Sequence, residues 1–80
     1  MKVIKRDGRA VDYNRDKIIT AIEKANSEVK GRQKATKEQI KEITNYIEDL
    51  DKKRILVEDI QDIIEQKLME FEKFELAKKY

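Results

Sequence analysis

Isoleucine and leucine recur at steps of three and four along most of this chain. Such spacing places apolar side chains on one face of an α-helix, and disordered chains lack it. The pattern predicts helices from about Asn14 to Lys30, from Thr36 to Leu50, from about Glu58 to Phe71, and over residues 73–80. Proline is absent and glycine occurs twice, so few positions force a break. The sequence therefore predicts a helix-rich fold.

Local signals mark where these helices begin and end. Asn14 is a favourable N-cap for the first helix, and Asp16 lies in its first turn, where a negative charge is favoured. Gly31 is the expected stop for that helix. Thr36 and Gln39 have the spacing of a capping box, which predicts the start of the second helix.

Residues 2–13 have the pattern of a β-hairpin. The pair Asp7-Gly8 favours a two-residue type I′ turn, in which both residues need a positive φ. In that register Arg6 lies opposite Arg9, and two like charges at that distance repel each other. The residues that favour strands on either side of the turn are Val3, Ile4, Val11 and Tyr13.

A third strand is predicted for the run Ile55–Val57. An isolated hairpin is marginal in water, so it needs a further strand or a helical backing. The expected fold class is α+β and mostly helical, with a small three-stranded sheet as a lid on a bundle of about four helices. Eighty residues make a single domain, 1–80, with a modest core.

Several classes of function are excluded by what the chain lacks. Without Cys or His it has no disulfide, zinc ribbon, imidazole metal ligand, or Cys–His or Ser–His nucleophile. It has no glycine-rich phosphate loop, and its acidic residues fall mostly on polar helix faces among Lys and Arg. We therefore expect no catalytic residues. No apolar run approaches the roughly 18 residues of a membrane span and no signal peptide is visible, so the expected location is the cytoplasm.

Positive charge is concentrated at the N-terminus. Residues 1–17 hold six basic and three acidic side chains, an excess of three, whereas the whole chain has a net charge of +2. Lys5, Arg6, Arg9 and Lys17 gather where the hairpin meets the start of the first helix, and a helix N-terminus attracts anions. On these residues alone, a phosphate site and an ordinary basic surface hairpin are about equally good explanations. Tyr13 is equally suited to stacking on a base or to closing the edge of the core.

Four short motifs occur in a characteristic order along the whole chain. They are V-x-K-R-D-G, K-I-x-x-A-I-x-x-A, I-x-V-E-D-I-Q-D and A-K-x-Y. Together they resemble the ATP-cone, the regulatory nucleotide-binding domain of ribonucleotide reductases. The sequence is most similar to the N-terminal domain of an anaerobic (class III) ribonucleoside-triphosphate reductase. The same domain occurs behind a zinc ribbon in a transcriptional repressor of reductase genes, a version that a chain without Cys fits poorly.

The resemblance implies allosteric control of overall reductase activity by ATP or dATP. In the family, ATP leaves the enzyme active and dATP switches it off; the expected partner is the catalytic domain of the parent reductase, and a role for Mg²⁺ is left open. The family's last helix normally continues past Tyr80, so the resemblance implies a domain cut slightly short at its C-terminus. By position, the resemblance assigns the adenine to Val3, Tyr13 and Ile18, the phosphates to Lys5, Arg6 and Lys17, the sugar or base to Asn14, and further nucleotide contacts to Val57 and Gln61.

Two other functions are weighed against nucleotide sensing. Small, slightly basic helical domains often bind nucleic acid. However, no predicted helix has a one-sided basic stripe, and the third helix is rich in acid, with Glu58, Asp59, Asp62 and Glu65. The second alternative is a purely structural interaction domain. In that case the charge of the hairpin only protects a soluble sheet edge.

Overall fold

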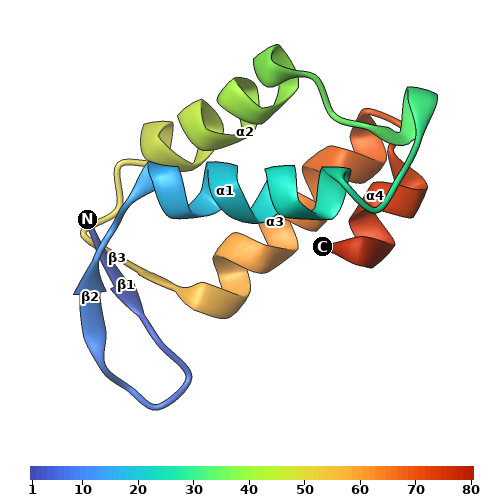
Figure 1. Ribbon diagram of the computed structural model, residues 1–80. Coiled ribbons are helices and arrows are strands. Elements are labelled where there is room, and N and C mark those ends of the chain that lie inside the picture. Colours follow the sequence, from blue (N-terminus) through green and yellow to red (C-terminus); the bar gives the residue numbers. More distant parts are fainter.

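Three short strands meet at one end of the molecule, and the helices extend from them (Figure 1). The computed structural model describes residues 1–80 and confirms the predicted α+β class. The elements in chain order are β1 (Lys2–Ile4), β2 (Ala10–Asp12), α1 (Arg15–Asn26), the 3₁₀-helix η1 (Gly31–Gln33), α2 (Lys37–Asp49), β3 (Arg54–Leu56), α3 (Val57–Glu70) and α4 (Phe74–Lys79).

The sheet has the strand order β2-β1-β3, with β1 antiparallel to β2 and parallel to β3. Val3 lies opposite both Val11 and Ile55, and all three belong to the core or pack against it. Because side chains alternate between the faces of a sheet, odd-numbered residues of these strands share the face that meets the helices. The predicted third strand is confirmed, one residue earlier than expected.

The predicted type I′ turn is wrong. Gly8 N donates to Lys5 O (2.9 Å) and Lys5 N donates to Arg9 O (2.8 Å), which makes a three-residue loop with Gly8 at φ +89°. This is a type I turn followed by a left-handed glycine. The register consequently shifts by one, so Ile4 pairs with Ala10 and Arg6 has no cross-strand partner. A two-residue loop would put Val3 and Val11 on opposite faces and expose one of them, so burial selects the longer loop.

Both predicted helix starts are confirmed by their caps. Asn14 Oδ1 accepts from Asp16 N (2.9 Å), and Thr36 and Gln39 form the complete capping box.

The predicted end of the first helix at Lys30 is wrong, because α1 ends four residues earlier, at Asn26. The Asn26 amide makes two 2.9 Å hydrogen bonds to the backbone of Ala35, and Ser27 Oγ donates to Lys24 O (2.6 Å). Side chains that bond to the backbone in this way compete with the helix. Gly31, at φ +54°, opens η1 instead of ending α1.

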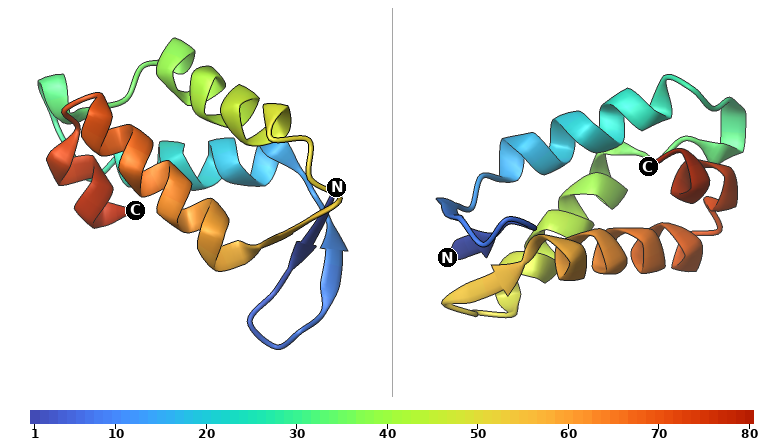
Figure 2. Two further views of the ribbon diagram at one scale, coloured as in Figure 1. Left: turned by 180° about the vertical axis from the view of Figure 1, so that it is seen from behind. Right: turned by 90° about the horizontal axis from the view of Figure 1, so that it is seen from below.

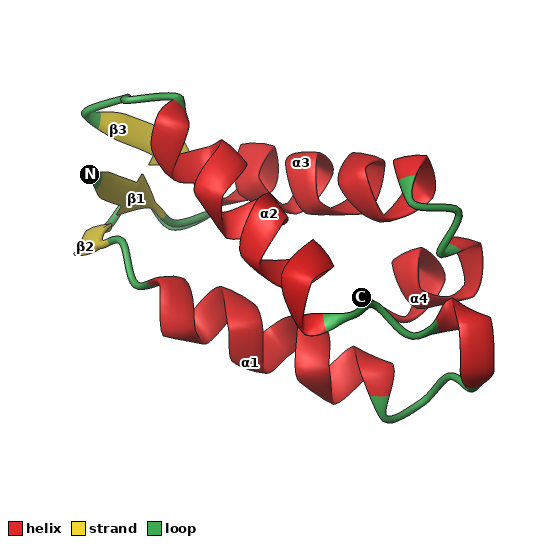
Figure 3. Cartoon of the chain, turned by 90° about the horizontal axis from the view of Figure 1, so that it is seen from above, coloured by secondary structure: helices red, strands yellow, loops and turns green.

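The core lies between the helices. As Figures 2 and 3 show, α2 packs against both α1 and α3, and α4 folds back against α3 and α1. No helix is long and apolar enough to cross a membrane. The large apolar side chains that are completely buried are Ile22, Ile43, Ile47, Ile64, Leu68 and Leu76.

Candidate functional site

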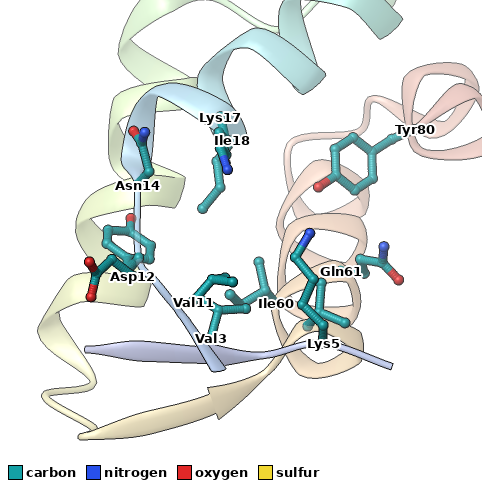
Figure 4. Close-up of a pocket in the computed structure, with 12 residues that line it drawn as sticks. Val3, Lys5, Val11, Asp12, Asn14, Lys17, Ile18, Ile60, Gln61 and Tyr80 are labelled. Atoms are coloured by element: carbon teal, nitrogen blue, oxygen red, sulfur yellow. The ribbon is translucent and has the colours of Figure 1, made fainter. Parts of the chain in front are cut away.

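A cavity of about 180 Å³ opens between the sheet and the first turns of α1 and α3 (Figure 4). Its walls are mostly apolar, and eight of the nine residues expected from the sequence line it. These eight are Val3, Lys5, Tyr13, Asn14, Lys17, Ile18, Val57 and Gln61, and the further lining residues are Val11, Asp12, Ile60 and Tyr80.

The register of the sheet decides which hairpin residues reach this cavity. Val3 and Lys5 on one side of the hairpin, and Val11 and Tyr13 on the other, have odd numbers and lie on the inner face. Asp12 has an even number and belongs to the outer face, so it contributes only to the rim of the cavity. Figure 4 shows its carboxylate pointing away from the centre. A slip of one residue would put Val3 and Lys5 on one face and Val11 and Tyr13 on the other, so the two sides of the hairpin could not both line the cavity.

Two cations face the cavity without an acidic partner. Figure 4 shows the amines of Lys5 and Lys17 directed toward the space between α1 and α3. Neither forms a salt bridge, although the chain has five. Lys17 lies in the first turn of α1, at the end of the helix that has a partial positive charge. The cavity is therefore a mostly apolar space with two lysines at its edge that form no salt bridge.

Arg6, the ninth expected residue, does not line the cavity. Its guanidinium lies over the start of α3, where it bonds to Gln61 Oε1 (3.3 Å) and approaches Glu58 Oε1 (3.4 Å). Arg6 thereby reaches the rim through Gln61, which does line the cavity.

The expected repulsion between Arg6 and Arg9 is absent. Arg9 turns back onto Asp7, whose carboxylate accepts from Arg9 N (3.1 Å) and Arg9 Nε (2.7 Å). These two hydrogen bonds hold the pKa of Asp7 below its ordinary value. Each arginine of the turn therefore has its own acidic partner, and the turn is electrostatically satisfied without a ligand.

Tyr13 connects the cavity to α2. Its ring packs against the core, and its hydroxyl donates to Glu48 Oε2 (2.7 Å). Arg15 Nε donates to the same oxygen (2.9 Å) and Arg15 Nη2 donates to Glu48 Oε1 (3.0 Å), so Glu48 accepts three hydrogen bonds from Tyr13 and the first residue of α1. Burial, followed by the hydrogen bond and charge of Glu48, raises the pKa of Tyr13, which remains a neutral phenol. This arrangement fixes one wall of the cavity.

Four lining residues were not expected from the sequence. Alternation with Tyr13 was the signal for Val11, and Ile60 follows Val57 at helical spacing. Tyr80 belongs to the A-K-x-Y motif, but only the fold of α4 places its half-buried ring over the cavity (Figure 4). Burial raises the pKa of Tyr80.

Comparison with models of protein families gives a match over the given residues. The family model described as the ATP cone domain matches residues 1–80, the full sequence. Domains of this family are regulatory modules that bind ATP or dATP allosterically and have no catalytic role of their own.

Proposed function

The chain belongs to the ATP-cone family, and from this premise we propose that its cavity binds ATP or dATP to regulate the overall activity of an anaerobic ribonucleoside-triphosphate reductase. The observation that carries the proposal is that one cavity gathers eight of the nine residues assigned by resemblance. They come from two separate stretches of the chain, residues 3–18 and residues 57–61, which include the hairpin, the start of α1 and the start of α3.

We assign the base to the cavity itself. Its volume of about 180 Å³ is below the roughly 300–1,000 Å³ of pockets that enclose a whole drug-sized ligand. A nucleotide therefore fits with only its base enclosed. Val3, Ile18 and Ile60 supply apolar walls, and Tyr13 and Tyr80 supply aromatic ones.

We assign the phosphates to the positive edge. Lys5 and Lys17 have no salt bridge to break, so an anionic ligand gains their charge without competing with an internal partner. Arg6 is the third cation, and it would leave Glu58 to reach a phosphate. The chain has no cluster of three acidic residues that could hold a metal ion, so Mg²⁺ would arrive on the phosphates.

Thermal unfolding with ATP, dATP, GTP and no ligand tests this function. A ligand at 100 times its dissociation constant adds about 2.7 kcal/mol to the free energy of unfolding. For a domain this small, that raises the midpoint temperature of unfolding by about ten degrees or more. We expect a rise with ATP and dATP and little change with GTP. An equal rise with all three would show binding of phosphates without recognition of the base, and no rise would refute the nucleotide site.

The reductase context needs a separate test. The domain is mixed with the catalytic part of an anaerobic reductase, and activity is followed as dATP replaces ATP. Loss of activity with dATP, and only when this domain is present, is the expected result. Unchanged activity would assign the domain to another target.

A further inference from the structure

A second hollow runs along the last turns of α3 and the start of α4. We name it the α3–α4 groove; its lining residues are Asp62, Glu65, Gln66, Met69, Glu70 and Phe74. None of them lines the nucleotide cavity. Met69 is 47% exposed and Phe74 52%, so two large apolar side chains face water together here. A soluble domain gains nothing from this exposure, whereas Met and Phe are enriched where proteins meet.

Negative charge surrounds these two side chains. Asp62 and Glu65 stand three residues apart on one helix, a spacing at which like charges repel, and neither forms a salt bridge. Of the carboxylates in the groove only Glu70 forms a salt bridge, with Lys67 Nζ at 3.6 Å. The acids that favour the dipole of α3 are Glu58 and Asp59 in its first turn, so Asp62 and Glu65 do not serve that purpose.

The charge decides what can cover the groove. A symmetric dimer would bring the same acidic groove of two copies face to face, which like charges oppose. Nucleic acid and anionic membrane surfaces are repelled for the same reason. A segment that places Lys or Arg around one or two apolar side chains is complementary in both charge and polarity.

We propose that the α3–α4 groove docks a basic amphipathic helix of a partner protein. The apolar side of that helix would lie on Met69 and Phe74, while its cations reach Asp62 and Glu65; this is the helix-in-groove mode of recognition. Six lining residues are far fewer than the 20–30 per side of a standard interface, so the contact is weak and readily reversed. The proposal does not depend on nucleotide binding.

The test uses the 80-residue chain and a synthetic helical peptide of leucine and lysine. Backbone amide chemical shifts map where the peptide binds, and a titration gives its affinity. We expect shifts confined to the end of α3 and the start of α4. A peptide in which glutamate replaces every lysine should not bind, and raising the salt concentration should weaken the lysine peptide.

Two pairs of variants separate groove binding from general attraction. Asp62→Lys/Glu65→Lys should weaken peptide binding at least tenfold, and Glu42→Lys/Asp49→Lys, with the same change in net charge on α2, less than twofold. Phe74→Ala should also weaken peptide binding about tenfold. Leu56 on β3 is an equally exposed apolar side chain, and Leu56→Ala should change the peptide affinity little.

Three results would overturn the proposal. The first is a set of chemical-shift changes spread over other surfaces of the chain. The second is an equal loss of peptide affinity in the two charge-reversal pairs. The third is self-association of the chain that Phe74→Ala abolishes, because it would make a second copy the occupant. The amide spectrum of each variant shows whether it is folded, so loss of binding cannot be confused with loss of structure.

Discussion

The two ends of α3 border opposite kinds of surface. Its first turns, with Val57, Ile60 and Gln61, line the cavity beside the unpaired amines of Lys5 and Lys17. Its last turns line the α3–α4 groove with carboxylates. The same buried stripe of Ile60, Ile64 and Leu68 runs beneath both.

The buried stripe therefore holds α3 in place, and the other residues of this helix give the cavity and the groove their different chemistry. The side chains that form no salt bridge are Lys5 and Lys17 at the cavity, and Asp62 and Glu65 at the groove. Helix α4 and its C-cap residue join the two surfaces, since Phe74 at the start of α4 lines the groove and Tyr80 at its C-cap lines the cavity. The predictions below test whether these surfaces are separate and whether α4 links them.

The largest effect is expected from Leu76→Ala. Leu76 is completely buried, so its truncation should lower the free energy of unfolding by about 2–5 kcal/mol, a large part of the stability of a small domain. Phe74→Ala, two residues earlier on the same helix but half-exposed, should change it by only about 0.5 kcal/mol. Urea unfolding followed by circular dichroism measures both. Equal losses would mean that Phe74 is part of the core and not of a free surface.

Lys17→Ala should have the next largest effect, on nucleotide binding. Loss of a charge-assisted contact of about 1.5–3 kcal/mol would weaken ATP roughly tenfold to a hundredfold. Stability and peptide binding in the groove should change little. Calorimetric titration measures the affinity, with Lys41→Ala on α2, outside the cavity, as the matched control. Wild-type affinity in Lys17→Ala would place the phosphates elsewhere.

A smaller effect is expected from coupling between the two surfaces, and this expectation depends on both proposals. Because α4 contributes to each, ATP should change the affinity of the leucine–lysine peptide by about fivefold, and the peptide should change the affinity for ATP by the same factor. Two titrations, each with the other ligand saturating, measure it. Binding of both ligands without any mutual effect would show that α4 does not transmit the signal.

The smallest effect concerns the hydrogen bond between Tyr13 and Glu48. Glu48 is partly exposed, so Tyr13→Phe should cost only about 0.5–1 kcal/mol of stability near pH 8. The pKa of Tyr13 is raised in the folded state, so its contribution is complete below the ordinary tyrosine pKa of about 10 and declines as pH rises above it. The difference between wild type and variant should therefore shrink between pH 9 and about pH 11 in urea unfolding. A constant difference would mean that Tyr13 stabilises the fold by packing alone.

Local chemistry in the sequence was sufficient for most of the architecture. The caps at Asn14 and Thr36, the apolar spacing of the helices and the β-prone run before α3 act over a few residues, so they can be predicted without a fold. The end of α1 could not be predicted in this way, because Asn26 stops the helix by bonding to the backbone of Ala35, nine residues away.

The residues that line the site could likewise be predicted only in part from the sequence. Residue types and family motifs identified eight lining residues, but whether Tyr13 lies on the same face as Lys5 depends on a register that burial of Val3 against Val11 selects. Tertiary packing alone brings Tyr80 over the cavity and Phe74 beside Met69. The physical reason is the range of the interactions: capping and periodicity are short-range and written in neighbouring residues, whereas register, helix ends and shared pockets depend on which distant surfaces bury each other.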